Sequence, residues 1–251
     1  MMGETGGGPG TWKAYMNLVR SGTALFVSGF LLLFFFAQST LVLSKAQAES
    51  YFAAEAGYAF PQSLSNGKAT QDGLGGLDIS DQSLKNSPMV GAKLGHYFSR
   101  VRWLGVETEV TYSNPHVKQG SLTFSGPGGQ LTFPVLPGLH QRMIMWAPVT
   151  LLVRYPGYRL QPYVGVGPGV FFANLNGPTA PPGQSGTAIG LNAEAGLRYY
   201  ITRHWSLSSE GKYNLARICY CSNDGNPNAD PFGFRATYSV FTVSLAIAYH
   251  F

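Results

Sequence analysis

Residues Tyr238–Phe251 read YSVFTVSLAIAYHF, and apolar residues alternate there with small or polar ones. A period of two is typical of a β-strand, in which successive side chains point to opposite faces. The apolar face would carry Phe241, Val243, Leu245, Ile247, Tyr249 and Phe251, and the other face Thr242, Ser244, Ala246, Ala248 and His250. This segment therefore predicts a strand with one apolar face and one small, polar face.

Seven further segments show the same alternation, so the sequence predicts eight strands. In most of them the face opposite the apolar one is rich in glycine, small, polar or charged residues. The segment 140–154 is apolar on both faces, and its register stays open. The seven segments are Tyr51–Phe60, Met89–Phe98, Leu104–Tyr112, His140–Arg154, Gln161–Ala173, Thr187–Ile201 and Trp205–Leu215.

The connections between these segments alternate strictly between long and short. A barrel that crosses an outer membrane has short periplasmic turns and long external loops. Since hydrocarbon cannot satisfy the backbone groups of an open edge, the sheet must close. We predict an eight-stranded antiparallel up-and-down transmembrane β-barrel over residues 49–251. Its rival is a soluble exported β-sandwich, which would bury the apolar faces. The long connections are Pro61–Pro88, Ser113–Leu139, Asn174–Gly186 and Ala216–Thr237.

The composition excludes several other classes. Only 12% of the 251 residues are charged, whereas about 25% is usual for a soluble domain. This argues against a coiled coil and a charged disordered tail. The net charge of +5 is scattered without a basic run, so no nucleic-acid surface is predicted.

Residues 1–48 resemble a secretory signal peptide. Arg20 precedes the uncharged segment Thr23–Leu43, and Ala46–Ala48 supplies a small-x-small cleavage site. We predict cleavage after Ala48, and the start at Met1 or Met16 stays open. The alternative is an uncleaved membrane helix, because the uncharged segment is long enough to span a bilayer.

Charged residues occur on the predicted inward faces. An eight-stranded barrel has room for side chains inside but not for an open channel, so these charges must pair. We interpret them as a salt-bridged plug that fixes the strand register; the alternative is a gated ion path or proton relay. The residues are Glu55, Lys93, Glu107, Glu109, Glu194, Arg198, Glu210 and Lys212.

Aromatic residues gather near the short turns, where they would form a periplasmic girdle. The same turns hold five arginines, which would either contact anionic lipid headgroups or simply sit at the wet rim. The arginines are Arg100, Arg102, Arg154, Arg159 and Arg203, and the aromatics are Tyr97, Phe98, Trp103, Tyr155, Tyr158, Tyr163, Tyr199, Tyr200, Trp205, Tyr249 and Phe251.

Several motifs resemble one known family. Phe241–Phe251 resembles the C-terminal insertion signal of bacterial outer-membrane barrels, with Tyr249 and the terminal aromatic Phe251. Gln161–Val170 is similar to the Pro-Tyr-Val-Gly-x-Gly strand of the small outer membrane protein beta-barrel family, of the opacity-associated or OmpX type. The resemblance implies an eight-stranded barrel in the bacterial outer membrane. It also implies insertion by the barrel-assembly machinery, with outer-membrane lipids and lipopolysaccharide as partners, and no shared catalytic residues.

No motif for chemistry is present. The sequence lacks His-Glu-x-x-His and Gly-x-Ser-x-Gly, and no strand places a serine and a histidine together facing lipid. The redox state of Cys219 and Cys221 stays open, since a disulfide two residues apart on one strand is geometrically awkward. We therefore expect no cofactor, no metal and a non-enzymatic structural role, with external loops that interact with an unidentified ligand. A lipid-A-modifying enzyme and a narrow porin-like pore are the alternatives.

Overall fold

The computed structural model describes residues 49–69, 77–126, 129–135, 138–177, 184–220 and 233–251. The predicted signal peptide, residues 1–48, lies outside these residues and stays a prediction. The described residues form thirteen strands. None of their elements is a helix long and apolar enough to cross a membrane.

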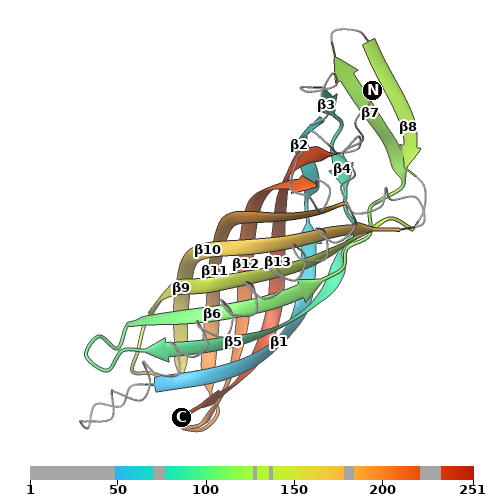
Figure 1. The fold of residues 1–251 in the computed structure, drawn as a ribbon. Coiled ribbons are helices and arrows are strands. Elements are labelled where there is room, and N and C mark those ends of the chain that lie inside the picture. The colour runs from blue at the N-terminus through green and yellow to red at the C-terminus, as the bar shows by residue number, and fades with distance from the viewer. Residues whose placement is uncertain (1–48, 70–76, 127–128, 136–137, 178–183, 221–232) are drawn as a thin grey trace, which may run out of the picture. The chain divides into compact units, whose positions relative to one another are not determined.

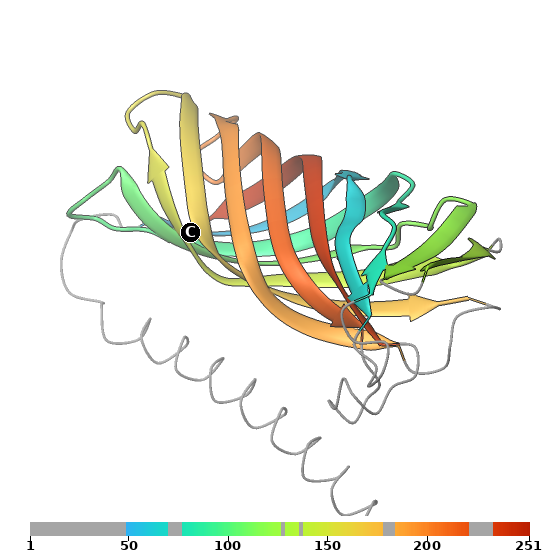
Figure 2. The same cartoon turned by 90° about the horizontal axis from the view of Figure 1, so that it is seen from above.

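Eight long antiparallel strands form a closed barrel, which confirms the predicted fold class. Each pairs with its neighbour in chain order, and β1 pairs with β13 to close the sheet (Figures 1 and 2). The strands are β1 Glu49–Pro61, β5 Ser87–Tyr97, β6 Leu104–Ser113, β9 His140–Arg154, β10 Leu160–Asn176, β11 Ser185–Tyr200, β12 Trp205–Tyr220 and β13 Phe234–His250.

The apolar faces point outward and the polar faces inward. Leu191 and Leu245 are 43% and 67% exposed, whereas Glu107 and Glu194 are 2% and 5% exposed. A soluble sandwich would show the reverse, because it buries apolar side chains. The outward face therefore suits hydrocarbon.

Exposed aromatic residues lie near both ends of the barrel wall. At the periplasmic end they are Phe52, Phe98, Trp103, Tyr155, Tyr158, Tyr199, Trp205 and Tyr249; at the external end they are Tyr58, Phe60, Tyr112, Phe172, Tyr213 and Phe241. Two such girdles are typical of outer-membrane barrels.

Three tyrosines expected in the periplasmic girdle lie inside the barrel instead. Tyr97 and Tyr163 are buried, and Tyr200 hydrogen-bonds to an interior carboxylate. The physical reason is strand parity: Tyr97 shares its face with Lys93, and Tyr163 shares its face with Gly165.

A β-bulge settles the open register of β9. Glu107 of β6 lies opposite Thr150, but Glu109 lies opposite Ala147, so β9 holds an extra residue between these pairs. The shift turns Thr150 and Leu152 inward on one side of the bulge, and Met143 and Met145 on the other.

The connections predicted as long loops contain further strands. The sheet continues from β13 through β2, β3 and β7 to β8, and β7 and β8 project beyond the barrel (Figure 1). These strands escape prediction because they are short or rich in glycine and serine. They are β2 Ser63–Ala69, β3 Asp78–Ile79, β4 Gln82–Ser83, β7 Gly120–Gly126 and β8 Gly129–Val135.

Candidate functional site

Lys93, from β5, lies at the centre of the barrel interior. Its Nζ atom is 2.7 Å from Glu210, 3.0 Å from Glu107, 3.4 Å from Glu194 and 3.6 Å from Glu109. All five side chains are fully buried. A single ammonium group therefore joins carboxylates from three neighbouring or facing strands, β6, β11 and β12.

Lys212, from β12, is the second cation of this group. Its Nζ atom is 2.5 Å from both Glu55 and Glu109 and 3.4 Å from Glu210. The Ser244 hydroxyl also donates to Glu55 at 3.2 Å. Glu109 and Glu210 contact both lysines, so the two sets of ion pairs form one network, the central charge cluster: Glu55, Lys93, Glu107, Glu109, Glu194, Glu210 and Lys212.

Tyrosine hydroxyl groups donate further hydrogen bonds to the carboxylates of the central charge cluster. Tyr51 donates to Glu107, and Tyr163 donates to Glu210. The Tyr51 ring fits beside β5 because residue 95 is glycine, where a Cβ atom would approach the ring to 2.3 Å. Of the five carboxylates that face the two ammonium groups, Glu107 and Glu210 thus gain a neutral hydrogen-bond donor, as Glu55 does from Ser244.

Arg198 is the one predicted charge that lies apart from this cluster. Its guanidinium carbon is 4.0 Å from the centre of the Tyr51 ring and 5.2 Å from that of Tyr163. Among the described residues no carboxylate lies within ion-pair distance of it. Burial against aromatic faces is a cation–π arrangement, so this layer closes the interior by packing.

A second polar group lies at the periplasmic mouth. Glu49 is 2.6 Å from Arg154 and 2.8 Å from His250, and it accepts a hydrogen bond from Tyr200. Sequence reasoning missed Glu49 because the predicted strand began at Tyr51. The contact ties β1 to β9, β11 and β13.

The mouth also contains a serine–histidine–carboxylate arrangement that the sequence analysis did not foresee. Ser206 Oγ lies 2.7 Å from His250 Nε2, and His250 Nδ1 faces Glu49. Serine hydrolases use this combination, but their nucleophile must meet a substrate. Ser206 is 0% exposed, and the rings of Tyr51 and Tyr200 lie 5.3 and 5.0 Å from the His250 ring.

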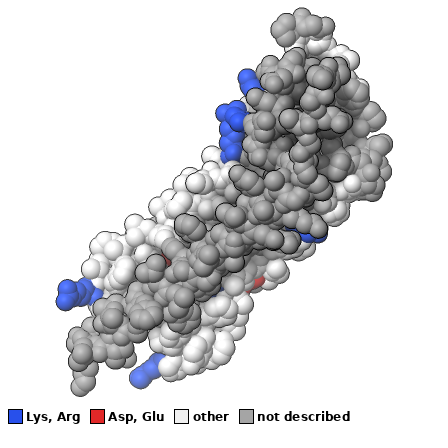
Figure 3. Space-filling model, in the orientation of Figure 1, with Lys and Arg blue, Asp and Glu red and all other residues white. Residues whose placement is uncertain are grey.

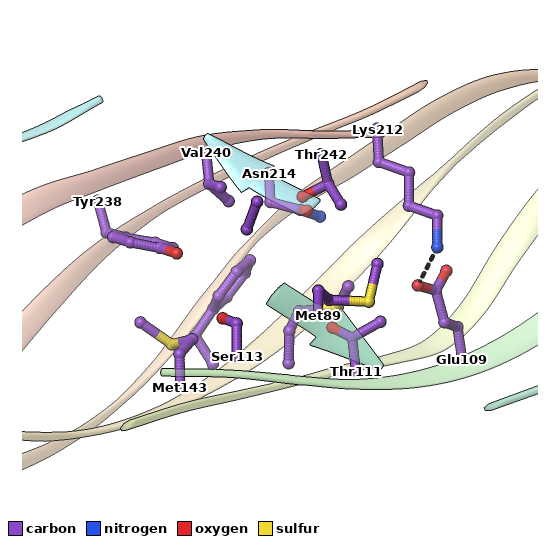
Figure 4. Close-up of a pocket in the computed structure, with 13 residues that line it drawn as sticks. Met89, Glu109, Thr111, Ser113, Met143, Lys212, Asn214, Tyr238, Val240 and Thr242 are labelled. Carbon is purple, nitrogen blue, oxygen red and sulfur yellow. Dashed lines mark hydrogen bonds and ion pairs between the residues drawn. The ribbon is translucent and has the colours of Figure 1, made fainter. Parts of the chain in front are cut away.

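The external half of the interior contains a large apolar cluster in place of the expected small and polar filling, although polar residues such as Ser113, Gln141 and Asn214 are buried beside it. Met143, Met145 and Phe171 pack there with Met89 and Tyr238. A cavity of about 20 Å³ lies between this layer and the Lys212–Glu109 ion pair (Figure 4). That volume is enough for about one water molecule.

Three carboxylates could in principle hold a metal ion. Oxygen atoms of Glu107, Glu109 and Glu194 lie within 4.8 Å of one another. However, the ammonium group of Lys93 is already within 3.6 Å of each. The lysine occupies the position that a cation would take.

Cys219 is the last residue of β12 whose side chain faces outward, and it is disulfide-bonded. Cys221 lies outside the described residues.

The comparisons with known proteins agree with this architecture. The sequence model of the outer membrane protein beta-barrel domain matches residues 28–239, most of the chain. The chain therefore belongs to this family, and it is a protein of the bacterial outer membrane. No curated protein matches it.

Solved outer-membrane barrels have similar structures. OprG from Pseudomonas aeruginosa is 16% identical with a TM-score of 0.51, over 80% of this chain and 96% of that one. Neisserial surface protein A is 16% identical with a TM-score of 0.49, over 82% and 99%. The outer membrane protease OmpT from Escherichia coli is 11% identical with a TM-score of 0.43, over 84% and 100%. At these identities the likeness extends to the fold alone.

Proposed function

We propose that this member of the family is a non-enzymatic structural barrel that presents its external strands for interaction at the cell surface. The observation that carries the proposal is the filled interior. Arg198 with its tyrosines, the central charge cluster and the apolar layer succeed one another along the barrel axis. What remains for contact with a partner is the outside, where β2, β3, β4, β7 and β8 extend the sheet.

Surface presentation is testable with two cysteine substitutions at positions of similar exposure. Leu131 in β8 is 63% exposed, and Tyr158 in a short turn is 65% exposed. We expect a membrane-impermeant maleimide to label Leu131→Cys on intact cells, and to label Tyr158→Cys only after the membrane is opened. The unsubstituted chain reports any background. Labelling of Tyr158→Cys on intact cells would show that the barrel has the opposite orientation in the membrane and would contradict the proposal.

The enzymatic alternative is favoured by one observation, the Ser206–His250–Glu49 contact. We expect it to be structural, because Ser206 is enclosed and no substrate can reach its hydroxyl. Lipid A extracted from cells with the protein, with the Ser206→Ala variant and without the protein should give the same mass spectrum. A change in acyl chains that requires both the protein and Ser206 would show that the barrel is a lipid A hydrolase.

A further inference from the structure

Three basic residues meet on the outer face of three adjacent strands. Lys68 of β2 lies directly opposite Arg235 of β13, and Arg235 lies opposite Cys219 of β12. Arg217 is two residues from Cys219 on the same face, so it is the diagonal neighbour of Arg235. All three are exposed, and Figure 3 shows Lys and Arg side chains along this edge, beside β2. We call Lys68, Arg217 and Arg235 the basic patch.

Within the described residues, the charge of the basic patch is poorly neutralised. Lys68 has a 3.8 Å contact with Asp78, and both side chains are largely exposed, so this pair is weak. In the part of the chain that the structure describes, Arg217 and Arg235 have no acidic residue within ion-pair distance. Like charges directly across a strand pair are destabilising, and an external anion would relieve the repulsion.

The position of the basic patch relative to the membrane identifies the anion. Along β12 the outward residues are Tyr213, Leu215 and then Arg217, so the change from apolar to basic occurs within one outward step. A strand rises about 3.3 Å per residue, which places Arg217 about 7 Å beyond Leu215. Tyr213 lies opposite Phe241 in the external aromatic girdle. Arg217 therefore lies just above the hydrocarbon, and Arg235 and Lys68 lie one outward step further, at the level of the outer-leaflet headgroups.

We propose that the basic patch binds the phosphate groups of a phosphorylated outer-leaflet glycolipid. Guanidinium groups match phosphate oxygens in pairs of hydrogen bonds, and the ammonium group of Lys68 adds a third positive charge. The acyl chains of the same lipid would lie along the outward apolar residues of β12 and β13. One lipid molecule would thus satisfy both the basic and the apolar parts of this face.

Native mass spectrometry of the detergent-solubilised barrel tests the site. The probe is lipid A with both phosphates, and the comparison lipid is the same molecule without phosphate. We expect lipid A to bind, and the triple variant Lys68→Gln, Arg217→Gln, Arg235→Gln to lose about tenfold or more in affinity, as removal of charge-assisted phosphate contacts implies. The control is Arg142→Gln, because Arg142 is also exposed but lies on β9, four strands from β13. Heat-modifiable migration confirms that each variant is folded.

Three results would overturn the proposal. Equal binding of the dephosphorylated lipid would show that phosphate is not recognised. An equal loss in Arg142→Gln would show that the basic patch is not a distinct site. Full competition by millimolar inorganic phosphate would indicate a site for soluble anions in place of a lipid headgroup.

Discussion

Lys93 is a fully buried cation with four carboxylates within 3.6 Å of its ammonium nitrogen. Strand parity places its side chain inside the barrel. Two of the carboxylates that it contacts, Glu194 and Glu210, come from β11 and β12, far along the chain. Glu194 is 101 residues away in the sequence, so no local pattern predicts the contact. Each carboxylate that loses Lys93 would remain in an interior that solvent does not reach.

We therefore expect Lys93→Met to destabilise the folded barrel by about 3–5 kcal/mol, the usual cost of removing one partner from a buried ion pair. Urea unfolding in lipid vesicles, followed by tryptophan fluorescence, measures the change. Lys118→Met is the matched control, because Lys118 is exposed, and its cost should be below about 0.5 kcal/mol. Equal stability of Lys93→Met and the unsubstituted protein would show that the cluster contributes nothing to the fold.

At the scale of the element, β13 both closes the barrel and carries the predicted insertion signal. The Phe251 N–H donates to the Ser50 carbonyl at 2.9 Å, which joins the end of the chain to the start of β1. The Phe251 side chain, in contrast, is 65% exposed and adds little packing. Its aromatic ring is thus free to act in assembly.

Phe251→Ala should therefore reduce the amount of protein inserted into the outer membrane several-fold while leaving the stability of the refolded barrel within about 0.5 kcal/mol. Quantitative fractionation gives the first value, and urea unfolding of the purified protein gives the second. Phe98→Ala, another exposed aromatic near the periplasmic end, should change neither. If the Phe251→Ala variant reached the membrane in normal amounts, Phe251 would not be part of an insertion signal.

The wall strands were predictable because all but β9 keep a period of two against lipid along the whole strand, whereas the bulge in β9 interrupts the period and left its register open. The external ends were not predictable. Arg217 and Cys219 occupy outward positions of β12, but they are not apolar, so the pattern fades while the strand continues to Tyr220. β7 and β8 pair mainly with each other. Their sequences, Gly-Ser-Leu-Thr-Phe-Ser-Gly and Gly-Gln-Leu-Thr-Phe, alternate polar and apolar residues, but over too few positions to stand out from the glycine-rich connection in which they lie.

In the candidate site, likewise, the direction of each side chain could be predicted from the sequence, but the contacts between side chains could not. The inward direction of Glu109 or Lys212 follows from the strand pattern, but their 2.5 Å contact depends on how far the strands are staggered around the barrel. The Ser206–His250 contact has the same origin, since it joins β12 to β13 across a register that neither strand sets alone. Parity is a property of a strand, whereas a contact inside a barrel is a property of the closed sheet.

At the scale of the whole molecule, the interior contains three successive obstructions of different chemistry. Arg198 with its tyrosines closes the periplasmic side, the central charge cluster fills the middle, and the apolar layer around Phe171 closes the external side. An ion on this path would have to displace paired charges and then cross the apolar layer. Desolvation makes the last step especially costly.

The barrel should accordingly show no current steps in planar bilayers, and Glu109→Gln should show none either, because the apolar layer remains when one charge is removed. A matched experiment weakens that layer directly: Phe171→Ala leaves the central charge cluster intact but removes a fully buried ring at its external side. We expect this variant to stay non-conducting as well, since the Arg198 layer still blocks the opposite end. Stable steps in the unsubstituted barrel whose size changes with Glu109→Gln would establish a conducting interior and make the porin-like alternative the better account of the molecule.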